Sequence, residues 1–385
     1  MRVLFTAHGA YGHLLPLMGL ARALADGGHD VVVATSSAFG AVVAAHGLTP
    51  HPAGMDDDAM VAEAQRQWPE TACQPPSAWA IRMFCEIAAP AMAADVAALI
   101  ATWRPDVVVR EEGEYGGPVA AAASGVPWAT VGWGSPLRPP EALAELGRLV
   151  APLWQSAGIR RPVGHGLYGA VAFDQCPPSL YAGRPPVGNR HGLRPAVAAE
   201  VDGPSLEARS TRPLAYVGFG TAPLFRDAPD LTRIAVLALV KRGFHVSVTT
   251  GDERLARELE AVRPDRVQAH GWVDLGRLMP LCDLVICHGG AGTVLAALGA
   301  GVPLVLLPRG APSQIRMSSA CEARGVGRAV VWDGTNTEEL GAAVDDVMSS
   351  ERFRSAAREV SKEISEMPAP STAVEILSGI AAQST

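Results

Sequence analysis

The strongest constraint on this 385-residue chain is a strand-helix-strand pattern that recurs in both halves. In the first half, residues 3–5 form a short apolar run, and residues 17–24 place leucine and alanine at i, i+3, i+4 and i+7. Gly27 and Gly28 end that helix, and residues 31–34 are apolar again. Continuous apolar strands that alternate with helices are typical of a parallel sheet covered on both faces. The first half is therefore expected to be a Rossmann-like α/β domain.

The same alternation restarts after a segment without periodicity. The segment between residues 194 and 213 resembles a linker, and apolar strands then return, beginning at residues 214–218. We expect two α/β domains, residues 1–195 and 213–367, joined by a linker at 196–212. A C-terminal helix at residues 368–385 is expected to pack back on the N-terminal domain. Further strands are expected at residues 106–109, 128–131, 246–249, 284–287 and 304–307, with loops and short helices at 55–90 and 136–190.

Charge and hydropathy exclude several classes of protein. The net charge is −7 and no basic run occurs, which argues against nucleic-acid binding. Apolar runs such as residues 302–307 are far shorter than the roughly 20 residues that span a bilayer. The N-terminal segment is interrupted too early for a signal peptide, so it is interpreted as a strand. A cytoplasmic protein without a membrane segment is expected, and the sequence leaves open whether it forms a homodimer.

The cysteines do not predict disulfides or a metal site. Six cysteines are scattered without a CxxC pair, and reduced thiols fit a chain without an export signal. Cys282, Cys287 and His288 are residue types that bind metals, but side chains alternate faces along a strand, so they are not expected to point to one site. The run Asp56-Asp57-Asp58 contains an Asp-x-Asp pair that fits a divalent metal, yet a solvated loop is the preferred interpretation. No metal is expected.

Two polar loops follow strands of the first half. His13 lies in the loop after the first strand, where ligands bind in parallel sheets, and its type suits a general base. A helix-capping or core histidine is the alternative. Glu111, Glu112 and Glu114 follow the strand at 106–109, and any of them can orient such a base. The alternative for each is a solvated acidic loop.

The second half contains a glycine-rich turn that suits a diphosphate. The run from His288 to Thr293 follows an apolar strand and opens a helix, so its backbone N–H groups and helix dipole favour an anion. Gly218 to Thr221 supplies a second glycine-lined strand end, and Trp272 adds an aromatic side chain. Neither loop reads GxGxxG or GxxxxGK[ST], which disfavours a dehydrogenase and an ATPase. Together these features predict a nucleotide diphosphate site.

These residues resemble those of the bacterial family 1 glycosyltransferases with the GT-B fold, which attach deoxysugars to antibiotic aglycones. The resemblance covers nearly the whole chain and is carried by five segments: Gly12 to Pro16, Gly125 to Pro127, Cys176 to Leu180, Gly271 to Val273 and His288 to Pro308. It implies two Rossmann-like domains that face each other across a cleft. A nucleotide-sugar donor would bind the C-terminal domain and a small acceptor the N-terminal domain.

The resemblance also implies roles for individual residues. His13 matches the base that deprotonates the acceptor, with inversion at the anomeric carbon, and Glu111 matches its supporting carboxylate, with Glu112 and Glu114 in reserve. Trp272 and Val273 match nucleobase contacts. The family needs no metal and no cofactor besides the nucleotide-sugar co-substrate. The remaining donor-binding positions are Gly12, Thr221, His288, Gly290, Gly292, Thr293, Ser313 and Gln314.

Two departures from the family pattern bear on the donor. Ala296 stands where plant relatives have a glutamate that clamps ribose hydroxyls, which fits the 2-deoxyribose of a dTDP-sugar. Ser313-Gln314 stands where the family has an Asp-Gln pair that holds sugar hydroxyls. Either the sugar lacks those hydroxyls, as a deoxysugar does, or sugar binding is impaired.

The acceptor is inferred from aromatic residues of the variable N-terminal segments. Trp68, Trp79, Phe84 and Trp154 are the candidates for its pocket, although each also suits the core. Together they favour a flat apolar aglycone such as an aromatic polyketide. The primary hypothesis is an inverting transferase of a deoxysugar from dTDP to such an aglycone. The alternatives are a nucleotide-sugar 2-epimerase and a catalytically silent homologue that acts as a binding protein.

Overall fold

The computed structural model describes residues 1–74, 79–159, 163–181, 188–195, 212–220, 229–332 and 337–383. The expected linker lies outside the described residues except for Arg212, and so does Thr221.

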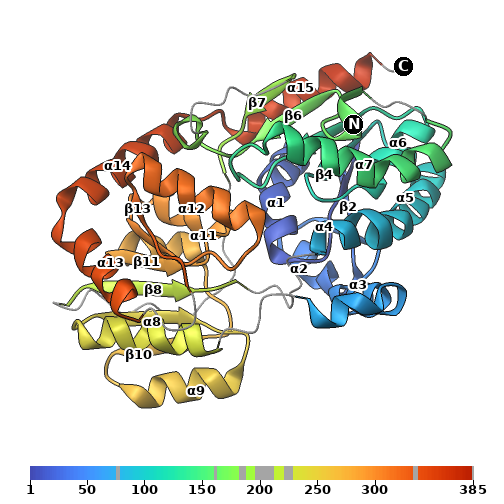
Figure 1. The fold of residues 1–385 in the computed structure, drawn as a ribbon. Coiled ribbons are helices and arrows are strands. Elements are labelled where there is room, and N and C mark those ends of the chain that lie inside the picture. Colours follow the sequence, from blue (N-terminus) through green and yellow to red (C-terminus); the bar gives the residue numbers. More distant parts are fainter. Residues whose placement is uncertain are drawn as a thin grey trace.

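The N-terminal half is built on a seven-stranded sheet in the order β3-β2-β1-β4-β5-β6-β7, with every neighbouring pair parallel (Figure 1). Its strands are β1 (Arg2–Thr6), β2 (Asp30–Thr35), β3 (Thr49–Pro52), β4 (Val107–Glu111), β5 (Trp128–Val131), β6 (Val171–Asp174) and β7 (Arg190–Gly192). Its helices are α1 (Tyr11–Asp26), α2 (Gly40–Ala45), α3 (Asp57–Gln67), α4 (Ala80–Met83), α5 (Ala89–Trp103), α6 (Gly116–Ala123) and α7 (Pro140–Ser156).

The C-terminal half repeats the plan with a six-stranded parallel sheet in the order β10-β9-β8-β11-β12-β13. Its strands are β8 (Leu214–Gly218), β9 (His245–Thr249), β10 (Val267–His270), β11 (Leu284–Cys287), β12 (Leu304–Leu306) and β13 (Gly327–Ala329). Its helices are α8 (Pro229–Lys241), α9 (Glu253–Val262), α10 (Leu275–Leu278), α11 (Ala291–Gly299), α12 (Pro312–Arg324), α13 (Thr337–Ser349), α14 (Glu351–Glu366) and α15 (Pro370–Ala382).

The strand orders fix where a ligand can bind. In each sheet the order reverses beside the first strand, between β1 and β4 in one half and between β8 and β11 in the other. Loops that leave adjacent strands in opposite directions open a crevice at the carboxyl ends, which is the usual ligand site of such sheets. The two reversal points are therefore the places at which to look for a site.

The segment 136–190, expected to hold only loops and short helices, contains more regular structure. It includes α7, a helix of 17 residues, and strand β6. Leu146, Val150 and Trp154 repeat every four residues along α7 and are buried, which gives the helix one apolar face. Pro140 occupies the first turn, where no N–H partner is required, whereas Pro152 lies inside the helix and leaves the buried face intact.

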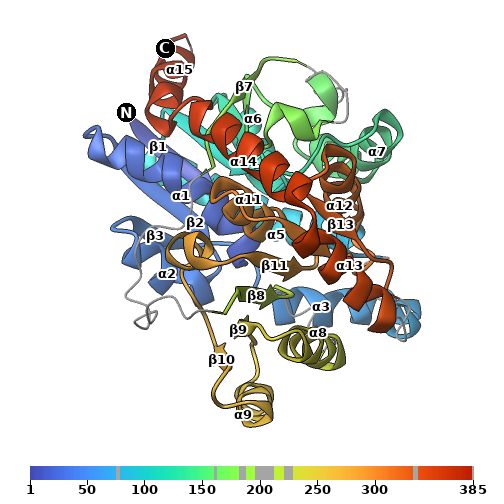
Figure 2. The same ribbon diagram turned by 90° about the vertical axis from the view of Figure 1, so that its left-hand side faces the viewer.

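The last helix crosses back to the N-terminal half. α14 packs on α11 of the C-terminal domain, and α15 then packs on α1, where Figures 1 and 2 show it beside the N-terminus. Ala373 and Leu377 of α15 are buried in the core that surrounds β1. The backbone N–H of Arg194 donates to the carbonyl of Pro368 at 2.7 Å, at the point where the chain crosses.

One helical stretch of the described residues, Ala80–Trp103, is long and apolar enough to cross a membrane by length and composition. It consists of α4, a π-helical turn at Phe84–Ala88, and α5. Met92, Val96 and Ile100 of α5 are buried in one cluster with Leu4 of the sheet. This packing accounts for the apolar face of the stretch as that of a core helix.

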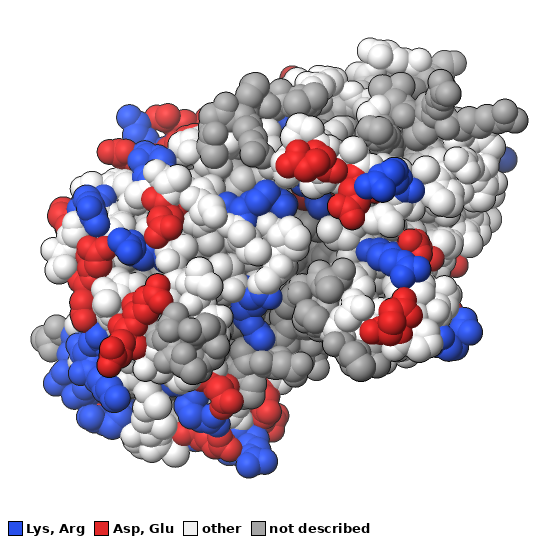
Figure 3. Space-filling view, viewed as in Figure 1, with Lys and Arg blue, Asp and Glu red and all other residues white. Residues whose placement is uncertain are grey.

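Charge is mixed over the surface. Figure 3 shows positive and negative side chains interspersed over the C-terminal domain rather than separated into a basic and an acidic face. Several pairs are ion pairs, such as Arg233 with Glu258 and Arg242 with Asp345. The five cysteines whose side chains are described are free and buried.

Replacing Leu377 by alanine tests the packing of α15. Because the side chain is fully buried in the N-terminal core, we expect Leu377→Ala to lower the free energy of unfolding by about 2–5 kcal/mol. Chemical denaturation followed by circular dichroism measures the change. Glu375→Ala, on the exposed side of the same helix, is the control and should change stability by less than about 0.5 kcal/mol. Equal stability of the two variants would contradict the packing.

Candidate active site

A cavity of about 620 Å³ lies between the two halves of the molecule. Its walls come from the carboxyl ends of both sheets, at the two points where the strand order reverses. The N-terminal half contributes Gly12, His13, Phe84, Tyr115, Trp133, Ser135 and Arg138, and the C-terminal half contributes Tyr216, Trp272, Val273, His288, Gly290, Gly292, Thr293 and Ser313.

His13 and Glu111 form the central polar pair of this cavity. His13 lies in the first turn of α1, and Glu111 is the last residue of the neighbouring strand β4. The Nδ1 atom of His13 is 2.8 Å from Oε1 of Glu111. The histidine side chain keeps 16% of its surface exposed to the cavity, whereas the glutamate side chain is completely buried. His13 can therefore act on a ligand while Glu111 acts only through His13.

The second carboxylate oxygen of Glu111 is held from the other side. Trp133 Nε1–H donates to Oε2 at 2.6 Å, and the backbone N–H of Gly113 donates to the same oxygen. The Trp133 ring also packs edge-on against the His13 ring, with centroids 4.6 Å apart. Both oxygens of the buried carboxylate have partners, which fixes the plane of Glu111 and the orientation of His13.

The pair shifts the pKa values of both residues in opposite directions. Burial lowers the pKa of His13, but the charge of Glu111 and the hydrogen bond to it outweigh burial and raise that pKa above 6.5. Burial raises the pKa of Glu111, but the charge and hydrogen bond of His13 outweigh it and bring that pKa to about 2. Glu111 is thus ionised at neutral pH and increases the basicity of His13.

The other two glutamates of the loop have different partners. Glu114 is buried and accepts hydrogen bonds from Thr6 Oγ1 at 2.6 Å and from the N–H groups of Gly116 and Gly117 at the start of α6. Glu112 faces Arg138. Of these three glutamates, all in the described part of the chain, only Glu111 lies within hydrogen-bond distance of the His13 ring.

A second histidine, which sequence analysis did not select, lies behind the first. His8 Nε2 is 3.1 Å from the carbonyl of Gly113, and its ring centroid is 5.5 Å from that of His13. Burial lowers the pKa of His8 to about 4, so its ring is neutral. Phe84, in the π-helical turn, packs on both rings at 4.7 and 5.3 Å. These rings shield the His13–Glu111 pair from water on that side.

The opposite wall is the glycine-rich start of α11. Gly290 is the N-cap residue, and Gly292 and Thr293 line the cavity in the first turn, where helical N–H groups have no intrahelical partner. A Cβ atom on Gly292 would have nothing within 4 Å, so there is open space beside the backbone. Gly289 has a φ of +84°, and a side chain there would collide with Ser318 and Gln314. The turn thus requires glycine and presents an anion-binding helix end.

His288 adds a side chain to this wall. Its Nδ1 atom is buried and has no hydrogen-bond partner in the described part of the chain. Burial lowers the pKa of His288 to about 4, so the ring is neutral. A buried polar atom without a partner is costly, and the ring that carries it also lines the cavity.

Comparison with known proteins identifies the family. Models described as erythromycin biosynthesis protein CIII-like match residues 22–184 (N-terminal domain) and 237–380 (C-terminal domain). The L-demethylnoviosyl transferase of Streptomyces niveus is 30% identical, and the alignment covers 100% of this chain and 98% of that protein. The chain belongs to the bacterial GT-B glycosyltransferases of natural-product biosynthesis.

Further relatives agree with this assignment. The 3-alpha-mycarosylerythronolide B desosaminyl transferase of Saccharopolyspora erythraea is 26% identical, with 99% of each chain covered. The crystal structure of the Streptomyces sp. SF2575 glycosyltransferase SsfS6, complexed with thymidine diphosphate, matches with a TM-score of 0.78 at 26% identity. That match covers 98% of this chain and 99% of the other. The predicted fold class of this glycosyltransferase, two Rossmann-like domains facing across a cleft, is confirmed.

The structure brings most of the predicted donor residues of this glycosyltransferase to the cavity. Trp272, Val273 and Ala296 line it from the C-terminal half, together with Tyr216, whose hydroxyl is 2.7 Å from Thr249 Oγ1. Ser313 and Gln314 line it at the start of α12, and Gln314 Oε1 accepts the backbone N–H of Arg309 at 2.8 Å. Thr221 lies outside the described residues.

Three of the four predicted acceptor residues do not line the cavity. Phe84 does, but Trp68 and Trp79 are buried in a cluster with Met60, and Trp154 is buried in another beneath α7. Their apolar surface is used for packing around α3 and α7, which composition alone cannot distinguish from a pocket wall. The N-terminal wall of the cavity is lined instead by residues that the sequence analysis did not select: Tyr11, Phe39, Ile81, Tyr115, Trp133, Ser135 and Arg138.

The aspartate run also differs from its expectation as a solvated loop. Asp56 is the N-cap residue of α3, and Asp57 begins that helix. All three aspartates line the cavity, and the charge of Asp57 contributes to the raised pKa of His13. Carboxylates at a helix N-terminus are favoured by the helix dipole, which explains their position. Among the described residues, no group of three or more His, Cys, Asp and Glu side chains is arranged to hold a metal ion.

Removing the charge of Glu111 tests the electrostatics of the pair. In Glu111→Gln, burial acts on His13 with less opposition, so the pKa of His13 should fall below its wild-type value. NMR titration of the histidine side chains measures both values. Glu114→Gln is the control, since Glu114 belongs to the same loop but bonds to Thr6 and the start of α6. If the pKa of His13 is the same in Glu111→Gln and in the wild type, the charge of Glu111 is not what raises it.

Proposed function

We propose that this glycosyltransferase transfers a deoxysugar from a dTDP-sugar to a small hydrophobic natural-product aglycone, with inversion at the anomeric carbon. One observation carries the proposal: a single cavity has the His13–Glu111 pair on one wall and the glycine-rich start of α11 on the other. A base and an anion seat that face each other are the two groups that such a transfer needs.

The acceptor wall supplies the base. His13, held by Glu111, takes the proton of the acceptor nucleophile as that atom attacks the anomeric carbon. The bond from the anomeric carbon to the diphosphate oxygen breaks at the same time, and its electron pair leaves with dTDP. Attack from the side opposite the leaving group gives inversion. The ionised Glu111 stabilises the imidazolium that forms, because the two groups share a hydrogen bond.

The donor wall stabilises the leaving group. Negative charge grows on the diphosphate as the bond breaks, and the N–H groups at the start of α11 are already oriented toward it. The open space at Gly292 gives the phosphates access to the backbone, and His288, which lines the cavity, provides a side-chain contact. Fixed donors of this kind act without a metal ion, so we propose metal-independent transfer.

The nucleoside subsite favours deoxyribose. Ala296 lines the cavity with a methyl group, so it offers no carboxylate to a ribose 2′-hydroxyl. The related SsfS6 structure contains thymidine diphosphate, which supports the same nucleotide here. Ser313 likewise replaces a carboxylate by a hydroxyl, which suits a sugar with fewer hydroxyl groups.

The acceptor side is wide and largely apolar. Phe84, Ile81, Tyr115 and Trp133 line it near His13, and the cavity volume lies within the usual range of about 300–1,000 Å³ for small-molecule sites. Aromatic walls favour a flat apolar ligand. The names of relatives, an elloramycin glycosyltransferase and an aklavinone rhodosaminyltransferase among them, support a natural-product aglycone.

Calorimetric titration with dTDP and UDP, in the presence of EDTA, tests the donor assignment. We expect dTDP to bind at least about tenfold more tightly than UDP, a difference of about 1.4 kcal/mol, because the ribose 2′-hydroxyl finds no carboxylate at Ala296. Tighter binding of UDP would contradict the deoxyribose argument. If neither nucleotide bound, the diphosphate seat would be wrong, and a role as a silent binding protein would be favoured.

A further inference from the structure

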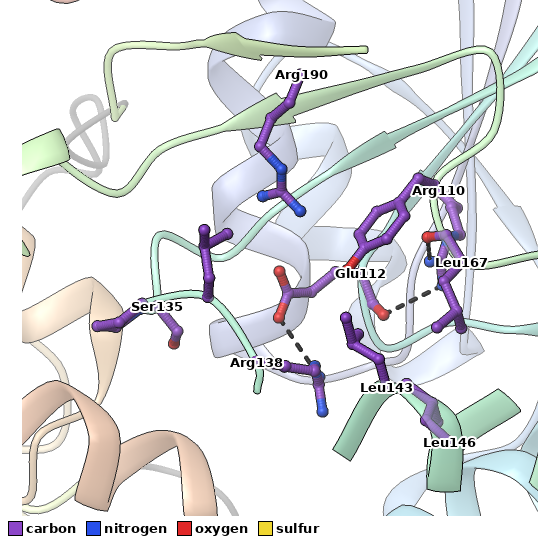
Figure 4. A pocket seen from close by; sticks show the side chains of 11 residues that line it. Arg110, Glu112, Ser135, Arg138, Leu143, Leu146, Leu167 and Arg190 are labelled. Atoms are coloured by element: carbon purple, nitrogen blue, oxygen red, sulfur yellow. Dashed lines mark hydrogen bonds and ion pairs between the residues drawn. The ribbon is translucent and has the colours of Figure 1, made fainter. Parts of the chain in front are cut away.

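Arg138 is a charged residue of the cavity that the proposed mechanism does not use. It follows β5 and lines both the large cavity and a small adjoining pocket, which Figure 4 shows. Its side chain is only 17% exposed. A guanidinium group buried to this extent needs partners, because desolvating a charge is costly.

Neighbouring residues compensate only part of the charge of Arg138. Among the described residues, Glu112 is its one hydrogen-bond partner, with Nη2 and Oε1 3.4 Å apart. Strong charge-assisted hydrogen bonds are about 2.7–2.9 Å long, and a guanidinium group has five N–H donors. The contact with Glu112 therefore leaves donors for a second partner.

The neighbouring arginines have closer partners. Arg110 donates to the backbone carbonyls of Glu112, Glu114 and Leu167, and Arg190 pairs with Asp174 at 2.7 Å. Of the described residues that line the small pocket, Glu112 is the only acid beside three arginines (Figure 4). Because Asp174 pairs with Arg190, Glu112 is the acid of this lining that is left for Arg138.

We propose that Arg138 binds a carboxylate or another ionised oxygen group of the acceptor. The inference rests on the proposed function and names the chemical class of its acceptor. Trp133 connects the two points of contact: its ring lies 4.6 Å from the ring of His13 and 5.8 Å from Cζ of Arg138. An aglycone stacked along Trp133 reaches His13 with its nucleophile and Arg138 with its acidic group.

The charge distribution also gives the acceptor a direction. Asp56, Asp57 and Asp58 line the cavity from α3, and they repel an anionic group from that end. Arg138 attracts it, and the planar guanidinium suits two-point binding of a carboxylate. Opposite charges along one apolar cavity thus select the orientation of an acidic aglycone.

A matched pair of probes tests the proposal without donor sugar. The probes are 7-methoxycoumarin-3-carboxylate and its methyl ester, which differ in charge at one position, and fluorescence titration measures their dissociation constants. We expect wild-type protein to bind the carboxylate about 10- to 100-fold more tightly, as hydrogen bonds to a charged group predict. In Arg138→Met this preference should vanish while ester binding stays within about threefold. Arg148→Met, which removes an exposed arginine of α7, is the control and should keep the preference.

Two further measurements make each outcome decisive. Binding of dTDP on the opposite wall reports whether Arg138→Met is folded. If the uncompensated charge of Glu112 prevents folding of that variant, the double variant Glu112→Gln/Arg138→Met is used in its place. A wild-type protein without preference for the carboxylate, or a preference retained in the folded methionine variant, would overturn the proposal. If the wild-type protein prefers the carboxylate but does not bind dTDP, the proposed function is contradicted, whereas binding of an anionic group at Arg138 is supported.

Discussion

The hydrogen bond between His13 and the buried Glu111 is the interaction on which the site depends. A carboxylate with no exposed surface must have partners for both oxygens, and Glu111 finds them in His13, Trp133 and Gly113. These residues follow three neighbouring strands, β1, β4 and β5, so the parallel order of the sheet is what brings them together. The same bond raises the basicity of His13 and makes the first wall of the cavity reactive.

The two sheets divide the chemistry because each has its crevice where its strand order reverses. The N-terminal crevice contains a base beside aromatic side chains, and the C-terminal crevice contains a helix end and a neutral buried histidine that suit a diphosphate. Neither half has both a base and a helix end that suits a diphosphate. Contacts across the boundary keep the crevices opposed: Gly134, with a φ of +84°, lies against Leu295 of α11, and α15 packs on α1. In the proposed function, this packing is what brings donor and acceptor together.

Local sequence patterns were sufficient to predict the fold class and the two polar loops. Apolar runs and glycine stops define strands such as β5 and β8, and His13, Glu111 and His288 stand at strand ends, where a parallel sheet places ligand-binding groups. The residues of the proposed acceptor wall were harder to predict, because the sequence does not distinguish an aromatic core residue from an aromatic pocket residue. Trp68, Trp79 and Trp154 pack in the core around α3 and α7. Trp133 carried a usable signal, since it follows β5, the neighbour of β4. Arg138 carried none, because its place depends on how the loop after β5 folds.

The most direct test of the account is the rate of sugar transfer from a dTDP-deoxysugar by His13→Ala, measured beside its affinity for dTDP. A general base contributes about 10²- to 10⁴-fold, so kcat/KM should fall by that factor while the dissociation constant of dTDP stays within about threefold. The separation is expected because His13 and the proposed nucleotide site lie on opposite walls of the cavity. A variant that transferred sugar at the wild-type rate would show that the His13–Glu111 pair is not the base.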